Sequence, residues 1–263
     1  MAHSERSAFD GPLVQNPCFE PREPGRAIPS MSAHVESWSR IVAVAEAGAG
    51  GAPTPSGLCV ACVEVLGVAG AGITLMDPSK AAAGYASDPA TQRLEELQFG
   101  LGEGPTVEAY TAGTPVVEPD LAGIGPARWV GFCPAAVAAG VRSVFSLPLQ
   151  VGAARVGTLT VYRAESGMLS DELTADMLVV AEMTTRLILS WQAEAPKGLL
   201  ASELNHDGVY LAVVHQASGM ISVQLDVGVG EALAVLRARS FASSRTVAEV
   251  AADVVARRVR FDD

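Results

Sequence analysis

The sequence of 263 residues predicts an α+β domain with a central, mostly antiparallel sheet, followed by a long helix and a small all-α domain of three helices. Two observations carry this prediction. Strand patterns and helical patterns are interspersed over residues 35–162, which is the order of elements in an α+β fold. Residues 209–255 then contain three helical patterns in series and no strand pattern between them.

The first part of the chain divides into a leader and the elements of the sheet domain. Residues 1–33 contain five prolines among glycines and charged residues without periodicity, so we expect a disordered leader there. The sheet domain is predicted over 34–195. Its expected elements are helices at 35–47 and 56–66, a strand at 72–76 with a hairpin partner at 84–87, helices at 88–99 and 106–111, a strand at 114–118, a helix at 135–139, and strands at 143–149 and 155–162.

A long helix over 171–193 closes this domain, and we interpret it as a signalling helix. Apolar and small residues recur along it at alternating spacings of four and three, which is the spacing of a coiled-coil seam. This pattern favours a homodimer, but it also fits a helix face that packs on the chain's own sheet, and both interpretations stay open. The seam consists of Leu173, Met177, Val180, Thr184, Leu187 and Trp191.

The last of the three C-terminal helices has the clearest pattern. Thr246 and Glu249 have the spacing of a capping box at its start. Apolar residues follow at the spacing of one helix face, from Val247 to Val255. Three arginines are expected in its last turns, where cations suit the helix dipole: Arg257, Arg258 and Arg260.

The other two helices have weaker patterns. The middle helix is expected to bury Leu233, Leu236, Ser240 and Phe241. In the first, Gly219 interrupts the apolar face, and a glycine inside a helix costs about 1 kcal/mol relative to alanine. We therefore expect a close approach by a neighbouring helix, or by a ligand, at that position.

Charge is unevenly distributed along the chain. The formal net charge of −11 argues against non-specific binding of polyanions. From Arg237 onward, however, the sequence contains six arginines and four acidic residues. This favours a specific contact by the C-terminal part. No run of eighteen apolar residues and no secretory signal is found, so we expect a cytoplasmic protein with no membrane partner.

Neither metal binding nor catalysis is indicated by motifs. Cys59 and Cys62 form a lone C-x-x-C in an apolar helical pattern without clustered histidines, so we expect inert thiols, no metal and no cofactor. No phosphate-binding loop or nucleophile motif is found, so we expect no enzyme. A thiol reductase using these cysteines or Cys133 is the enzymatic alternative, but apolar surroundings raise a thiol pKa. Glu95 and Glu96 are expected on a solvated helix face.

The C-terminal fragments resemble a known family. The runs 216–220, 231–237 and 247–255 resemble the ANTAR domain, a three-helix RNA-binding module of bacterial transcription antiterminators. The resemblance covers about 199–261, and the domain is taken as 199–263. It implies an RNA partner.

The sheet domain resembles the GAF half of actinobacterial GAF–ANTAR regulators, through 101–105, 119–121 and the hairpin 146–161. GAF domains are sensory pockets, so the resemblance implies an unknown small-molecule or redox input. Some relatives sense through a cysteine that follows the Gly-Pro. This chain has Thr106 at that position, so we expect no such cysteine sensor here.

Together these observations predict a signal-responsive antitermination regulator that binds RNA stem-loops. A DNA-binding transcriptional regulator is the alternative, although the third helix is mostly Val and Ala where a DNA reader needs polar base-reading side chains. We expect the RNA surface on the first two helices, packed as an antiparallel pair, with secondary phosphate contacts after the third. Its residues are Gln216, Ser218, Gly219, Met220, Arg237 and Arg239, then Arg257, Arg258 and Arg260.

Overall fold

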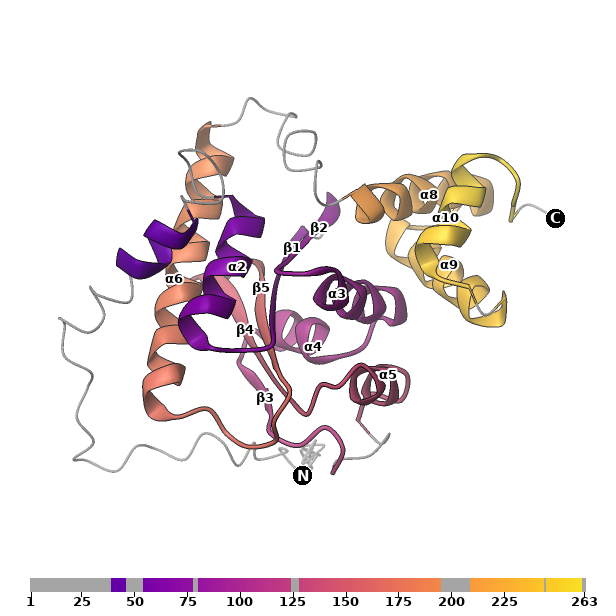
Figure 1. Ribbon diagram of the computed structural model, residues 1–263. Helices are drawn as coiled ribbons and strands as arrows, with labels where there is room; N and C mark the ends of the chain where they lie inside the picture. Colours follow the sequence, from indigo (N-terminus) through magenta and orange to yellow (C-terminus); the bar gives the residue numbers. More distant parts are fainter. Residues whose placement is uncertain are drawn as a thin grey trace, which may run out of the picture.

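A computed structural model of the chain describes residues 39–45, 54–77, 80–123, 128–194, 209–243 and 245–261. The predicted leader and the break after the long helix lie outside these residues. The α+β prediction is confirmed: one sheet lies between two layers of helices, and three further helices lie beside the layer that contains α3 (Figure 1). The elements are α2 (Pro55–Leu66), β1 (Gly70–Asp77), β2 (Lys80–Ala86), α3 (Pro89–Leu101), α4 (Pro105–Ala112), β3 (Val116–Glu118), α5 (Phe132–Ala138), β4 (Ser143–Val151), β5 (Ala154–Arg163), α6 (Asp171–Glu194), α8 (Val209–Leu225), α9 (Val229–Ser243) and α10 (Val247–Val255).

The sheet has five strands in the order β2-β1-β5-β4-β3, and every neighbouring pair is antiparallel. The predicted hairpins, β1 with β2 and β4 with β5, are both present, and β4 turns into β5 at Gly152 with a φ of 58°. β5 lies at the centre, where Gly72 of β1 and Ser146 of β4 pair with Thr160 on either side. The central strands therefore have neighbours on both edges and helices on both faces.

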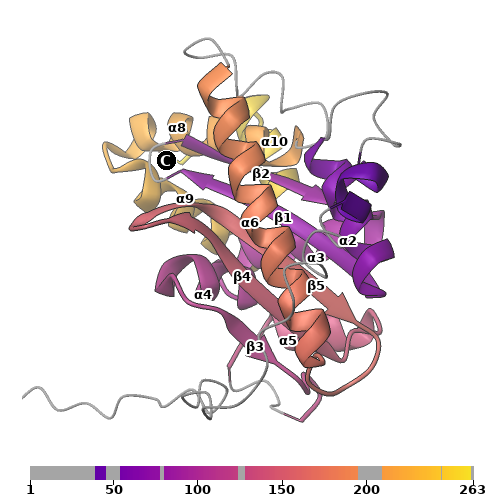
Figure 2. The same ribbon diagram turned by 90° about the vertical axis from the view of Figure 1, so that its left-hand side faces the viewer.

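One face of the sheet is apolar and packs against α2 and α6 (Figure 2). Alternate residues of the strands, such as Ile73, Leu147 and Leu159, point to this side because side chains alternate between the faces of a strand. α2 is held in place at its start by Thr54, whose hydroxyl accepts a hydrogen bond from the Gly57 amide. The largest hydrophobic cluster among the described residues lies here.

The predicted seam of α6 also faces this cluster. Met177, Val180 and Thr184 are almost fully buried within the single chain, and Leu173 and Leu187 pack partly against the same cluster. The middle of the seam therefore packs on the chain's own sheet, so Met177, Val180 and Thr184 are not available to pair two protomers, whereas Leu173 and Leu187 stay partly exposed. The Trp191 side chain lies outside the described residues. A homodimer stays a prediction without an assigned surface.

Helices α8, α9 and α10 enclose a separate hydrophobic cluster, and we call them the C-terminal module. The capping box at Thr246 and Glu249 is confirmed, with both reciprocal hydrogen bonds present. Two predictions for this module are wrong. The chain turns through 104° between α8 and α9, so the two helices are closer to perpendicular than to antiparallel. Phe241 is 83% exposed, because the buried face of α9 runs through Ala232, Leu236 and Ser240.

Within the described residues, no single helix is both long and apolar enough to cross a membrane. Only the bent pair Val213–Leu225 and Val229–Ser243, taken together, meets that condition by length and composition.

Candidate functional site

The second face of the sheet, beneath α3 and α4, carries buried polar side chains beside a second hydrophobic cluster that includes Val116 and Val144. Thr158, Thr160 and Tyr162 alternate along β5 on this face, and all three are at most 1% exposed. Thr74 of β1 and Ser146 of β4 are also buried beside them. Because buried polar groups are costly unless they are hydrogen-bonded, such a layer requires partners from the helices that cover it.

Glu95 of α3 supplies most of these partners. The Tyr162 hydroxyl donates to Glu95 Oε1 at 2.5 Å, and the Thr74 hydroxyl donates to Oε2 at 2.9 Å. The Thr106 hydroxyl lies 3.2 Å from Oε2. Gly72 leaves room for this carboxyl, since a Cβ there would lie 2.7 Å from Oε1. We call Glu95, Gln98, Thr74, Thr106, Thr160 and Tyr162, together with Ser146, the polar cluster.

Gln98, one turn further along α3, completes the cluster. Its side-chain amide donates to the Tyr162 hydroxyl at 2.7 Å and to the Thr106 hydroxyl at 2.9 Å, and its oxygen accepts from the Thr106 backbone N–H at 2.8 Å. Thr160 links Thr106 to Ser146 through hydroxyl contacts of 2.8 and 2.7 Å. The start of α4 is therefore joined to the sheet and to α3 by one continuous network.

The expectation that Glu95 lies on a solvated helix face is wrong. The buried face of α3 consists of Thr91, Leu94, Glu95 and Gln98, which have ideal helical spacing but only one apolar member. Hydrophobicity alone cannot reveal such a face. The alternation of Thr and Tyr along β5 is the signal that indicates a polar layer in the sheet, although it does not show that the layer is covered.

Burial raises the pKa of Glu95 above its ordinary value, and the hydrogen bonds from Tyr162, Thr74 and Thr106 oppose the rise only in part. The same burial, together with the Glu95 charge, raises the pKa of Tyr162 well above its usual range. One hydroxyl on this face stays unused: Thr158 Oγ1 is buried and has no hydrogen-bond partner among the described residues. The polar face thus combines a carboxyl whose pKa is raised with a hydroxyl that has no partner among the described residues.

The raised pKa predicts a pH-dependent stability. The folded state holds the Glu95 proton more tightly than the unfolded state does, so this contribution to the free energy of unfolding is present below the ordinary Glu pKa and is lost as pH rises through the folded value. As pH rises, we expect the free energy of unfolding of Glu95→Gln to increase relative to that of wild type. The measurement is urea unfolding from about pH 4 to 8. Glu96→Gln, whose carboxylate bonds Gln92 on the exposed side, is the control. A difference between Glu95→Gln and wild type that does not vary with pH would contradict the assignment.

The predicted RNA-binding residues of α8 differ in their accessibility. Gln216 is exposed, Gly219 is half-buried, and Met220 packs partly against the module's cluster. Ser218 is 2% exposed and its hydroxyl donates to the Val214 carbonyl at 2.9 Å, so it is not available to a partner. No neighbouring helix approaches Gly219 closely, because a Cβ there would meet nothing within 4 Å among the described residues, and approach by a ligand stays a prediction.

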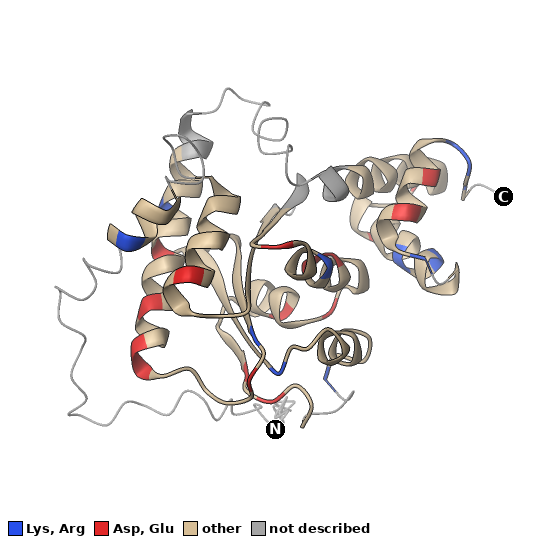
Figure 3. Ribbon diagram, in the orientation of Figure 1, with Lys and Arg blue, Asp and Glu red and all other residues tan. Residues whose placement is uncertain are grey.

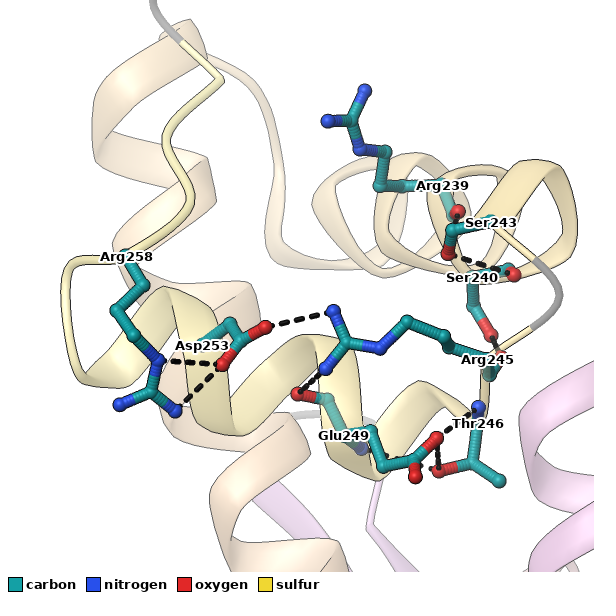
Figure 4. A network of polar contacts seen from close by, with 8 residues as sticks. All are labelled: Arg239, Ser240, Ser243, Arg245, Thr246, Glu249, Asp253 and Arg258. Carbon is teal, nitrogen blue, oxygen red and sulfur yellow. Dashed lines mark hydrogen bonds and ion pairs between the residues drawn. The ribbon is translucent and has the colours of Figure 1, made fainter.

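The predicted arginines also separate into groups (Figure 4). Asp253 binds both Arg245, at 2.7 Å, and Arg258, at 2.6 Å, and these pairs hold α10 to its flanking segments. The arginines at 257, 258 and 260 follow the helix instead of lying in its last turns, because α10 ends at Val255 and Arg257 has a φ of 58°. Arg239 is exposed and points away from this network.

Arg237 is the largest departure from the expected surface. It is half-buried, and its Nε and Nη2 donate to the backbone carbonyl of Phe99 in α3 at 3.1 and 2.7 Å. Its guanidinium carbon lies 5.4 Å from the centroid of the Phe99 ring. In this conformation Arg237 therefore contacts the sheet domain of its own chain and is not part of an open surface.

The described cysteines, Cys59, Cys62 and Cys133, are buried and unpaired. Burial raises the pKa of Cys59 well above its usual range and that of Cys62 to about 12, and it also raises the pKa of Cys133. Within the described residues, no group of three His, Cys, Asp or Glu side chains is placed to hold a metal ion. Inert, metal-free thiols stay a prediction.

Comparison with known proteins gives structural likenesses only. No protein-family profile matches the chain, and no curated protein matches it. Solved structures that match include the GAF domain of a phosphoenolpyruvate-protein phosphotransferase from Coxiella burnetii, with 17% identity, a TM-score of 0.48 and coverage of 62% of this chain and 96% of that one. The GAF domain of the corresponding Acinetobacter protein has 12% identity and a TM-score of 0.46, and covers 64% and 99%.

A third match is a free methionine-R-sulfoxide reductase from Neisseria meningitidis, with 17% identity, a TM-score of 0.41 and coverage of 64% and 97%. These are likenesses at low identity. The α+β assignment rests on the sheet order and the helix layers of the chain itself.

Proposed function

We propose that this protein is a signal-responsive transcription antitermination regulator, in which a GAF-like sensory domain controls RNA binding by the C-terminal module. The observation that carries the proposal is the module itself: three short helices with their own hydrophobic cluster and an arginine-bearing surface. This module comprises the three runs that resemble the ANTAR domain. Antitermination follows if the bound RNA fold excludes a terminator hairpin.

The polar cluster is the proposed input site of the sensory domain. Its buried Glu95 carboxyl lies on the same sheet face as the Thr158 hydroxyl, which has no hydrogen-bond partner among the described residues, and this face is opposite the main hydrophobic cluster. A small polar molecule, or a proton, that competes for these groups would change the contacts between the sheet and helices α3 and α4. We assign no particular ligand.

The exposed part of α9 is the proposed RNA-contacting surface. Arg239 makes no ion pair within the described part of the chain, and Phe241, two residues further, is 83% exposed. A guanidinium suits phosphates or base edges, and an exposed aromatic ring suits an unstacked base. Figure 3 shows basic residues on α9, whereas acidic residues follow α6 in the sheet domain. Gln216 of α8 and the arginines after α10 are secondary candidates.

The alternatives have weaker support. A DNA-binding regulator would need base-reading side chains on a recognition helix, but the exposed side of α10 carries Glu249 and the partly exposed Asp253. A thiol reductase would need a thiol that ionises readily, whereas burial raises the pKa of each described cysteine. Titration with duplex DNA tests the first of these alternatives.

Replacing Arg239 tests the proposed surface. We expect Arg239→Ala to weaken binding to a cognate stem-loop and to reduce the slope of log affinity against log salt by about one, as loss of a phosphate contact requires. The measurement is an equilibrium titration at several salt concentrations, with leader RNAs of neighbouring transcription units. Arg186→Ala, on the exposed side of α6 where Arg186 pairs with Glu182, is the control. Identical affinity and salt slope in wild type and both variants would exclude this surface.

A further inference from the structure

The contact between Arg237 and α3 is a helix cap supplied from another part of the fold. The last four carbonyls of a helix have no partner within it, and cations stabilise that end through the helix dipole. In α3 the Gln98 carbonyl accepts from the Gly102 amide, and the Phe99 carbonyl accepts two hydrogen bonds from Arg237. The last turn of α3, residues 98–101, contains no Lys or Arg of its own. Arg237 therefore supplies the cation that this helix end lacks.

Small residues of the sheet domain make room for the contact. Gly102 has a φ of 70°, and a Cβ at this position would lie 2.8 Å from Arg237 Nη1, so a side chain would displace the guanidinium. A Cβ at Gly100 would lie 3.3 Å from Cγ2 of Val247, the first residue of α10. Phe99 also packs against the hydrophobic cluster of the C-terminal module. Arg237 of α9 and Val247 of α10 thus contact the same turn of α3, and α8 packs against β2.

The same turn is linked to the polar cluster. Helix α3 carries Glu95 and Gln98 on its inner side, one helical turn before Phe99 and Gly102, which surround the Arg237 guanidinium. The Gln98 side chain fixes the start of α4 and the Tyr162 hydroxyl, while its backbone carbonyl accepts from Gly102. A change in the cluster that moves Gln98 also moves the carbonyl that Arg237 binds. α3 is therefore an element on which both sites act, as coupling between sites requires.

We propose that Arg237 is an intramolecular latch that holds the C-terminal module against α3. Its guanidinium is then withheld from RNA until the polar cluster rearranges. The proposal rests on the proposed function for its RNA readout, but the docking itself is independent of it. Burial lowers the pKa of Arg237, which indicates that its charge is partly desolvated in the docked position. Release of the module returns the guanidinium to solvent.

The latch is tested from the α3 side, so that Arg237 itself stays intact. Gly100→Gln is compatible with a helical α3 and places a long side chain against Val247, so we expect it to weaken the contact between α3 and the module. The matched control is Gly230→Gln, in α9, where a Cβ would meet nothing within 4 Å among the described residues. Docking is measured in the full chain by hydrogen exchange of the amides of residues 99–103, and RNA affinity by titration with the leader stem-loops.

We expect Gly100→Gln to speed this exchange and to raise RNA affinity by about tenfold, if the docked state is about ten times more populated than the open one. Gly230→Gln should leave exchange at 99–103 unchanged. Unchanged exchange in Gly100→Gln would overturn the docking contact. Faster exchange with unchanged RNA affinity would overturn its regulatory role. If neither wild type nor Gly100→Gln binds RNA, the proposed function is contradicted. The exchange data alone then decide whether the docking contact exists.

Discussion

Replacing Val254 with Asp is expected to unfold the C-terminal module and leave the sheet domain folded. Val254 is fully buried in the small hydrophobic cluster of α8, α9 and α10. The substitution removes apolar contacts and places a carboxyl where it has no partner, at a cost on the order of 4 kcal/mol. A domain with a hydrophobic cluster of this size has a small free energy of unfolding, so a loss of this magnitude unfolds it. Hydrogen exchange should therefore show loss of protection over α8 to α10 only, together with loss of RNA binding.

Val223→Asp is the matched control for this experiment. Val223 lies in the same module but is 83% exposed, so the same change should alter stability by no more than about 0.5 kcal/mol. If Val254→Asp also removes protection from the strands of the sheet, the two parts fold as one cooperative unit. That result would contradict the description of the module as a separate output domain.

Removal of the Tyr162 hydroxyl is expected to destabilise the sheet domain by about 1–3 kcal/mol, the range for leaving buried hydrogen-bonding groups without their partner. In Tyr162→Phe, Glu95 Oε1 loses its shortest hydrogen bond and the Gln98 amide loses one acceptor. The ring itself still fills its place against β4 and α3. The measurement is urea unfolding of the full chain followed through the β-sheet signal in circular dichroism.

Tyr110→Phe provides the comparison. The Tyr110 hydroxyl is only partly buried, and its hydrogen bond to the Met76 carbonyl is long at 3.3 Å, so its loss should cost about 0.5 kcal/mol or less. Equal destabilisation by the two variants would show that the polar cluster has no special role in holding α3 and α4 to the sheet.

Much of the fold follows from local patterns in the sequence. Alternating strand patterns on either side of Gly152 predict the hairpin of β4 and β5, and the spacing of Thr246 and Glu249 predicts the capping box that starts α10. These signals depend on residues close in sequence, so a single chain suffices to read them. The α+β class follows from their order.

The site could be predicted only in part, because its decisive contacts join residues far apart in the sequence. The sequence predicts Arg237 on an RNA-binding surface, but it binds the Phe99 carbonyl, and no local pattern connects the two. It also predicts Glu95 in solvent, because a carboxylate on a helix is usually exposed. The burial of Glu95 depends on Tyr162 and Thr74 from two different strands. The α6 spacing fits two interpretations equally well, since a buried face and a coiled-coil seam have nearly the same period.

The most direct test of the proposed function is the choice of nucleic acid by the wild-type protein. Equal concentrations of a leader stem-loop RNA, the same sequence as duplex DNA, and an unrelated RNA hairpin are titrated with the full chain at one fixed salt concentration. We expect the leader stem-loop to bind in clear preference to both competitors. Equal affinity for the duplex DNA and the stem-loop, or no binding to the stem-loop by wild type and by Gly100→Gln, would contradict the proposed function.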